Sequence, residues 1–250
     1  MRSRPSPAVT ELLTYLVDLG FEELQLGRAE ASAEPPAAAS ATPRTAPAET
    51  PPTVPAALAA RADAAEALAR QAAAAVTCTR CRLAEGRRTV VFGMGSADAD
   101  LMFIGEGPGA QEDRQGLPFV GPAGELLTRI IQAIDLRRED VYIANIVKCR
   151  PPGNRDPRPN EVAACRGWLH DQIETIKPRV IVMLGKVAAQ TLLGSDEPLG
   201  RMRGSWHRVL GVDARATYHP AALLRNASFK RPTWEDMQVV RDRLREGAAS

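Results

Sequence analysis

Hydrophobic residues follow one spacing in the first part of the chain and another after Val76. From Ala8 to Leu19, large apolar residues recur at helical intervals, which predicts a short amphipathic helix within residues 1–27. Residues 28–75 are rich in Ala and Pro and hold almost no large apolar residue, which predicts a disordered linker. The last part of this linker, Ala56–Ala75, is Ala-rich and favours a helix that leads into a folded domain.

After Val76, apolar runs of strand length alternate with longer stretches of helical spacing. Strands that alternate with helices are typical of a parallel sheet covered on both faces. We therefore expect an α/β domain over residues 76–250, with three α/β/α layers around a central, mostly parallel four-stranded sheet. The predicted strands are Leu101–Ile104, Val141–Val147 and Val180–Leu184, with further candidates at Trp206–Leu210 and Ala214–Tyr218. The predicted helices are Ala123–Ile134, Asn160–Ile176, Lys186–Leu193 and Pro232–Glu246.

Three segments with unusual residues lie where predicted strands end. They are Gly105–Gly109, Asn145–Cys149 and Tyr218–Pro220. Parallel α/β sheets bind their ligands at the carboxyl ends of the strands. These three segments are therefore expected to meet and to form a binding site.

Charge is distributed unevenly along the 250 residues, whose net charge is +2. Residues 1–75 carry 6 basic and 9 acidic side chains, a net charge of −3, and the other 26 basic and 21 acidic side chains give residues 76–250 a net charge of +5. A mildly basic domain permits binding to a polyanion. No apolar run reaches 18 residues and no signal-peptide pattern is present, so we expect a cytoplasmic protein without membrane contact.

Four cysteines need a reason other than disulfide bonding, which a reducing cytoplasm disfavours. Cys78 and Cys81 form a C-x-x-C pair in a polar stretch, Cys149 follows a predicted strand, and Cys165 lies in the next predicted helix. Burial in an apolar core suits Cys165 but not the pair. Four thiolates suit either a structural zinc ion or a [4Fe–4S] cluster, and their spacing does not separate the two.

The glycine-rich segment Gly105–Ala110 formally fits the G-x-G-x-x-A pattern of dinucleotide-binding proteins. The match is weak, because Pro108 lacks the backbone N–H that a phosphate would need and no helix is predicted to begin at once. We expect instead that the backbone approaches a flat ligand closely and that Gly105, Gly107 and Gly109 leave room for it. A tight turn without a ligand is the simpler alternative for this loop taken alone.

Three ordered motifs together resemble the family 4 uracil-DNA glycosylases, the iron–sulfur branch of the uracil-DNA glycosylase superfamily. The motifs are Gly105–Asp113 continued by Gly116–Gly121, then Asn145–Asn154, and then His219–Arg225. The cysteines also fall where that family holds its cluster. The resemblance covers about Val76 to Leu244. It implies a DNA-repair hydrolase that acts in base excision repair near the nucleoid, as a monomer, on uracil in single- or double-stranded DNA.

The resemblance assigns roles that suit base removal, for which a base must be flipped out of the stack, held flat and read at its edge. Phe119 would supply the stacking face, although a lone Phe is more often a core residue. Asn145 would pair with N3–H and O4 of uracil, where the alternative is an Asn that satisfies a turn. His219 would stabilise the negative charge that grows at O2, where the alternative is a helix cap.

Further residues receive roles only through the resemblance. Glu112 would exclude the methyl group of thymine, and Glu106 would support catalysis through Asn154, although either Glu could be ordinary surface charge. Leu223 or Leu224 would wedge into the duplex, and Arg225 would contact a phosphate. The substrate-binding set is Gly105, Gly107, Glu112, Phe119, Asn145 and His219, and the set that holds the [4Fe–4S] cluster is Cys78, Cys81, Cys149 and Cys165.

Two other functional classes fit part of the sequence. One relative in the superfamily binds uracil-DNA covalently without turnover through a reactive His in a basic loop, but residues 150–160 contain no His. A zinc-stabilised DNA-binding module would keep the cysteines and the basic charge, but it would give no reason for Asn145 and His219 at strand ends. The helix within residues 1–27 is expected either to hold a partner protein or to pack on the catalytic domain.

Overall fold

The computed structural model describes residues 54–246, with side chains from residue 61 onward. The amphipathic helix predicted within residues 1–27 and the linker up to residue 53 lie outside the described residues. Chain contacts assign the residues from Ala60 onward to one compact unit. None of the described helices is both long and apolar enough to cross a bilayer.

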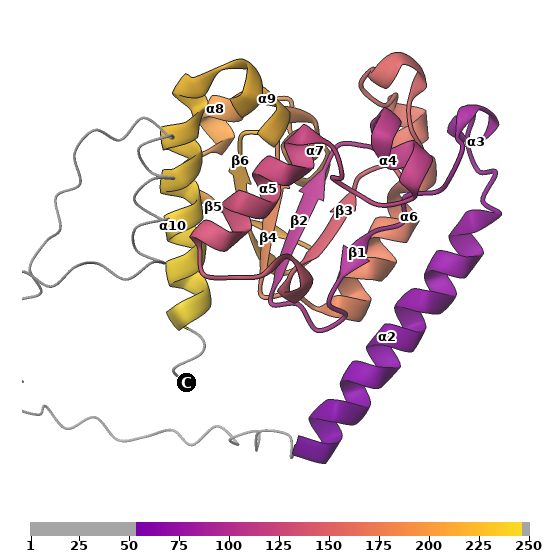
Figure 1. Ribbon diagram of the computed structural model, residues 1–250, viewed down its shortest axis with the longest axis horizontal. Coiled ribbons are helices and arrows are strands. Elements are labelled where there is room, and N and C mark those ends of the chain that lie inside the picture. The colour runs from indigo at the N-terminus through magenta and orange to yellow at the C-terminus, as the bar shows by residue number, and fades with distance from the viewer. Residues whose placement is uncertain (1–53, 247–250) are drawn as a thin grey trace, which may run out of the picture. The chain divides into compact units, whose positions relative to one another are not determined.

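Six strands form a single sheet in the order β1-β3-β2-β4-β6-β5 (Figure 1). The four central strands are parallel to one another, and the two edge strands run antiparallel to their neighbours. The predicted mostly parallel α/β fold is therefore confirmed, with six strands rather than four. The strands are β1 (Met94–Gly95), β2 (Leu101–Gly105), β3 (Tyr142–Asn145), β4 (Val180–Leu184), β5 (Trp206–Val209) and β6 (Val212–Thr217).

The two additional strands are both at the edges of the sheet. β1 has only two residues, which is too short for any alternation of apolar and polar positions to mark it. β5 turns back into β6 through Leu210 and Gly211, whose φ angles are +49° and +81°. Two central residues with positive φ form the tight turn that suits the twist of paired strands.

Helices cover both faces of the sheet. Successive side chains of each central strand point to opposite faces, and each face has its own core of apolar residues. Along β2, Met102 and Ile104 pack with helices α2, α6 and α7, while Leu101 and Phe103 pack with α5, α9 and α10. The strands are apolar throughout because neither face meets water. The covering helices are α2 (Val54–Val76), α6 (Pro159–Ile176), α7 (Lys186–Leu193), α5 (Pro122–Ala133), α9 (Pro220–Arg225) and α10 (Lys230–Glu246).

Short helical segments make up most of the connections at the carboxyl ends of the strands and around the sheet. They are α3 (Leu83–Gly86), α4 (Ala110–Gln115), α8 (Leu199–Met202) and the single 3₁₀ turns η1 (Arg138–Asp140), η2 (Pro152–Asn154) and η3 (Ala227–Phe229). Strand register brings the ends of β2 and β3 together, since Gly105 pairs with Asn145. Leu184 pairs in the same way with Thr217 at the ends of β4 and β6. The loops that follow these four strands therefore meet at one edge of the sheet.

The helix expected over Ala56–Ala75 is present as α2, and its second half packs on the domain. Leu68 and Ala75 are buried in the core on the α6 side of the sheet. The side chain of Gln71 donates a hydrogen bond to the hydroxyl of Thr175 in α6, with the two atoms 2.9 Å apart. This part of the predicted linker is therefore part of the folded unit.

Candidate active site

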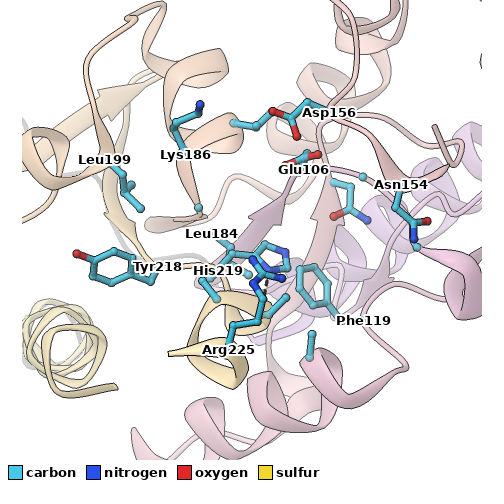
Figure 2. A pocket seen from close by; sticks show the side chains of 18 of the residues that line it. Glu106, Phe119, Asn154, Asp156, Leu184, Lys186, Leu199, Tyr218, His219 and Arg225 are labelled. Atoms are coloured by element: carbon cyan, nitrogen blue, oxygen red, sulfur yellow. Dashed lines mark hydrogen bonds between the residues drawn. The ribbon is translucent and has the colours of Figure 1, made fainter. Parts of the chain in front are cut away.

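A cleft of about 610 Å³ opens at the carboxyl ends of the central strands (Figure 2). It brings together residues from all three segments that were singled out at predicted strand ends. Those that line it include Glu106, Gly107, Glu112, Phe119, Asn145, Asn154, Tyr218, His219 and Arg225. Among the residues assigned by resemblance to catalysis, substrate or DNA, Gly105, Leu223 and Leu224 do not line this cleft.

Asn145, the last residue of β3, is buried at the base of the cleft with 2% of its surface exposed. Its side-chain Oδ1 has no hydrogen-bond partner, although a buried polar atom nearly always has one. The side chain packs against Gly105, where an added Cβ would lie 2.5 Å from Oδ1 of Asn145 and 2.7 Å from the ring of Phe119. Gly105 therefore makes room for two site side chains rather than directly for a ligand, which corrects the expectation for this glycine.

Phe119 is held in a strained backbone conformation that turns its ring into the cleft. Its φ angle is +52°, a region that bulky residues rarely occupy. The guanidinium of Arg138 donates hydrogen bonds to the carbonyl oxygens of Pro118 and Phe119, at 2.8 and 2.9 Å. A Cβ at Gly124 would lie 1.8 Å from the Phe119 carbonyl oxygen, so only glycine fits beneath this turn. The stacking face is thus fixed by backbone contacts behind it.

His219 lies against Phe119 in the lining of the cleft. It precedes α9 and caps it, since its Nδ1 accepts a hydrogen bond from the backbone N–H of Ala221 at 3.1 Å. Burial, reinforced by the nearby Arg225 guanidinium, lowers the pKa of His219 to about 4, against an opposing effect of Glu112. The imidazole is therefore neutral near pH 7. With Nδ1 occupied as an acceptor, its proton is carried by Nε2, which is the nitrogen left to donate to a ligand.

Glu106, Asp156 and Lys186 form a charged group on one side of the cleft, as Figure 2 shows. Burial and the Asp156 carboxylate together raise the pKa of Glu106 to about 7, against an opposing effect of Lys186. A carboxyl group with a pKa near 7 is suited to accept a proton from water. Oδ1 of Asn154 accepts a hydrogen bond from Arg150 at 2.8 Å, and among the described residues no hydrogen bond joins Asn154 to Glu106. The support of Glu106 through Asn154 stays a prediction.

Glu112 is anchored in the cleft wall by backbone N–H groups. Its Oε1 accepts from Val120 at 3.1 Å and from Gly121 at 3.4 Å. These two residues directly follow Phe119, so the same loop carries the stacking face and the anchor of the carboxylate. Glu112 is consequently a fixed part of the wall rather than a mobile surface charge.

Leu223 and Leu224 lie on helix α9 and face in opposite directions. Leu223 is only 3% exposed and belongs to the core with α5 and α10, so it cannot reach DNA and its assignment as a DNA contact is wrong. Leu224 is 50% exposed. Arg225, the next residue, is exposed and lines the cleft beside His219 (Figure 2).

All four cysteines line a second cavity, on the α6 side of the sheet. Backbone or guanidinium N–H groups point at two of the sulfurs: Arg87 donates to Cys149 at 3.4 Å, and the N–H of Lys148 donates to Cys165 at 3.3 Å. The indole Nε1 of Trp168, which lines the same cavity, is buried without a partner. Among residues 54–246, no three His, Cys, Asp or Glu side chains converge closely enough to hold a single metal ion.

The sequence matches the uracil DNA glycosylase superfamily over residues 92–238, more than half of the chain. The chain belongs to this superfamily. It is 44% identical over 176 residues to a type-4 uracil-DNA glycosylase of Saccharolobus solfataricus, covering 67% of this chain and 82% of that protein. The corresponding enzyme of Thermotoga maritima is 45% identical over 175 residues, 68% of this chain and 90% of that protein. The resemblance to the type-4 group is thereby confirmed.

A uracil-DNA glycosylase of another type is less similar to this chain than the two type-4 enzymes are. A type-5 uracil-DNA glycosylase of Pyrobaculum aerophilum is 32% identical over 208 residues, 70% of this chain and 89% of that protein. The sequence identity to this chain is therefore higher for the type-4 enzymes than for this type-5 enzyme.

Several cleft residues were not found from the sequence. Asp156 and Lys186 line the cleft, and Arg138 supports it from behind. Lys186 begins α7 immediately after strand β4, so the rule that ligands bind at strand ends would have found it. Arg138 contacts only backbone carbonyls and one hydroxyl in this loop region, and no sequence pattern marks such contacts.

Proposed function

We propose that this protein removes uracil from DNA by hydrolysing the N-glycosidic bond, leaving an abasic site in an intact strand. The observation that carries this proposal is the buried, unpartnered Oδ1 of Asn145 in a cleft walled by Phe119 and a neutral His219. An orphaned acceptor beside an aromatic face fits a flat ligand that carries a donor on its edge. A uracil flipped out of the stack is such a ligand, and it can reach the cleft only out of the duplex.

Recognition would rest on Asn145 and Glu112. The amide of Asn145 would accept from N3–H of uracil and donate to O4, and cytosine presents the opposite pattern at these two positions. The carboxylate of Glu112 is fixed by two backbone N–H groups in the same wall. Placed beside C5, it would leave no space for the methyl group of thymine.

Bond cleavage would rest on His219 and Glu106. As the bond breaks, negative charge develops on O2 of the leaving uracil, and the Nε2–H of a neutral His219 would donate to it. A donor held in place by the helix cap needs no reorganisation during the reaction. Glu106, whose pKa is raised to about 7 by burial and Asp156, would accept a proton from the attacking water.

The cysteine cavity fits a [4Fe–4S] cluster held by Cys78, Cys81, Cys149 and Cys165. The four sulfurs share one cavity. The unpartnered indole N–H of Trp168 requires an acceptor, and the inorganic sulfides of a cluster are acceptors. The cluster would supply structural cross-links between distant segments, while the cleft residues perform the chemistry.

Contacts to DNA would come from the end of α9. Exposed Leu224 would fill the gap left by the flipped nucleotide, and Arg225 would bind a phosphate. A monomer suffices for this, acting on single- or double-stranded DNA at the nucleoid.

From the sequence alone, we also propose that residues 1–27 hold a partner protein through an apolar helical face, tethered by the Ala- and Pro-rich segment up to residue 53.

The activity is tested with a labelled oligonucleotide containing one uracil. We expect free uracil, an abasic site that alkali converts to a break, and repeated turnovers. Oligonucleotides with thymine or cytosine at the same position serve as controls and should stay intact. Absence of turnover would overturn the proposal, and a protein–DNA adduct that survives denaturation would indicate the covalent, non-turnover class instead.

The cofactor is tested separately by anaerobic purification followed by measurement of iron, sulfide and zinc. We expect about four iron and four sulfide per chain, as the cluster formula requires. Stoichiometric zinc without iron would overturn the cluster assignment and leave the glycosylase proposal untouched.

A further inference from the structure

Lys148 is a fully buried lysine between the cleft and the cysteine cavity. Only 1% of its surface is exposed, and it also lines the cavity of the four cysteines. Within residues 54–246, no ion pair joins it to an Asp or Glu. Burying an amino group without a carboxylate is costly, so its hydrogen bonds must compensate.

The contacts of Lys148 extend in two directions. Its Nζ donates to the backbone carbonyl of Asn145 at 2.9 Å and to Oε1 of Gln172 at 2.5 Å. Its backbone N–H donates to the sulfur of Cys165 at 3.3 Å. A single residue thus bonds to the base-reading strand end and to a residue of the cysteine cavity.

Gln172 turns these contacts into a rigid connection with helix α6. It is completely buried, and its Nε2 donates to the carbonyl of Phe92 at 2.9 Å and to the hydroxyl of Tyr142 at 3.0 Å. Tyr142 begins β3, the strand that ends at Asn145. The side chains of Gln172 and Lys148 therefore hold both ends of β3 against α6.

The end of β3 is the point where this connection matters for the cleft. The N–H groups of Ile146 and Val147 continue the pairing with β2, at 2.9 Å from Gly105 O and 3.2 Å from Glu106 O. The carbonyl of Asn145 points the other way, toward Lys148. Without that donor the peptide group between Asn145 and Ile146 is held only through the N–H of Ile146, so its orientation, and with it the direction of the Asn145 side chain, is less firmly fixed.

We infer that Lys148 is a positioning residue, which fixes the end of β3 and with it the Asn145 amide to helix α6 and the cysteine cavity. This inference rests on the proposed role of Asn145 in reading uracil. It assigns to Lys148 no contact with the substrate. Hydrogen bonds through Cys165, Lys148 and Asn145 also connect the cysteine cavity to the cleft.

The test compares Lys148→Met with Lys177→Met in cluster-loaded protein. Methionine has nearly the same length as lysine and suits an apolar site, while Lys177 is exposed at the end of the same helix α6 and serves as the matched control. We expect Lys148→Met to slow single-turnover uracil release by about 10-fold to 100-fold, the scale of a misplaced site group. Lys177→Met should match the parent protein.

A double-mutant cycle separates positioning from general damage to the fold. If Lys148 acts through Asn145, Lys148→Met should slow the Asn145→Ala variant by less than about twofold. Amide hydrogen exchange of Ile146 and Val147 should also accelerate in Lys148→Met, whether or not the protein cleaves DNA. Should this variant not fold, Gln172→Met provides a second test. It removes the acceptor for Lys148 together with the donors to Phe92 and Tyr142, and it should show the same pattern.

Two results would overturn the inference: an unchanged rate together with unchanged exchange in Lys148→Met, or an equal slowing of the parent and the Asn145→Ala protein. A parent protein that releases no uracil would refute the proposed function. In that case the exchange measurement would still decide whether Lys148 fixes the end of β3.

Discussion

The imidazole of His219 stacks on the ring of Phe119, with ring centroids 5.4 Å apart and the two planes inclined by 28°. The two residues come from loops that follow different strands, β6 and β2, with β4 between those strands in the sheet. Each ring also has an independent support, since a helix cap holds His219 and Arg138 holds the backbone of Phe119. The positions of both rings in the cleft lining are therefore set before a ligand enters.

Replacement of His219 should affect the chemical step more than DNA binding. We expect His219→Ala to lower the single-turnover rate by about 100-fold, because one preorganised donor to the leaving group is lost. Phosphate contacts carry most of the affinity, so the dissociation constant for DNA should change little. His170→Ala, outside the cleft, is the control. An unchanged rate in His219→Ala would contradict the role given to its Nε2–H.

The same histidine should make the free energy of unfolding depend on pH. Its pKa of about 4 in the folded protein lies below the value of about 6.5 for an exposed histidine. As the pH falls from about 6.5 toward 4, the unfolded chain takes up a proton that the folded chain does not, so the free energy of unfolding decreases. Denaturant titrations at pH 7 and pH 4.5 should show a smaller decrease in His219→Ala than in the parent. Equal decreases would contradict a neutral, buried imidazole.

The pH dependence of the rate should report Glu106. If its carboxylate activates water, the rate rises with pH through about 7, where this group loses its proton. Lys186→Met removes a cation that lowers this pKa and should move the rise to higher pH. Asp156→Asn removes an anion that raises it and should move the rise to lower pH. Shifts in the reverse directions, or no rise near neutrality, would exclude Glu106 as the base.

Arg138 should matter for catalysis although it lies behind the cleft. Arg138→Met removes the donors to the carbonyls of Pro118 and Phe119, which allows the strained turn to relax and withdraw the ring. We expect a loss of about 10-fold in single-turnover rate, and little further loss when Phe119 is already replaced by Ala. The exposed Arg129 on α5 provides the control Arg129→Met. Equal losses with and without the Phe119 ring would show a different role for Arg138.

Leu223 and Leu224 should give opposite results when each is replaced by Ala. Leu223→Ala should cost about 2–5 kcal/mol of unfolding free energy, because the side chain fills the core. Leu224→Ala should leave stability nearly unchanged and reduce the rate on double-stranded DNA more than on single-stranded DNA, since only a duplex must be held open. Thermal melting and a comparison of the two substrates measure these effects. A similar rate loss on both substrates would argue against a wedge.

Two truncations should separate the N-terminal segment from the folded unit. Deletion of residues 1–53 should preserve the melting temperature and the cleavage of short oligonucleotides. Deletion of residues 1–76 should lower the melting temperature, because it removes the buried Leu68 and Ala75 and the hydrogen bond of Gln71 to Thr175. A large loss of stability in the shorter truncation would mean that residues 1–53 pack on the domain, and the tether would be abandoned.

Sequence patterns predict the centre of this fold better than its edges. Strands β2, β3 and β4 are buried on both faces, so their continuous apolar runs are visible in the sequence. β1 leaves no such run because it is two residues long. Its pairing with β3 depends on a neighbour that is distant in the sequence, and a local pattern carries no record of that neighbour.

Site residues could be predicted from the sequence where a single side chain carries the chemistry. Residues that act through contacts with the backbone could not. Asn145 and His219 are polar residues at the ends of apolar strands, which marks them in the sequence. The separation of Leu223 from Leu224 depends on how α9 is rotated against α5, and adjacent leucines do not reveal this. The hydrogen bond of Lys148 to the carbonyl of Asn145 is likewise set by tertiary packing alone.

The cysteine cavity also constrains how the chain can fold while it is being made. Cys78 and Cys81 leave the ribosome early, but Cys165, which completes the cavity, follows 87 positions after Cys78. Until then the first pair has no partners, and α2 has no α6 to pack against. Domains generally fold as synthesis proceeds from the N-terminus, yet here helix α2 must wait for α6, which lies in the middle of the chain. The cavity can therefore close only after Cys165 has been synthesised. Until then the thiols of Cys78 and Cys81 are accessible to solvent and to oxidants.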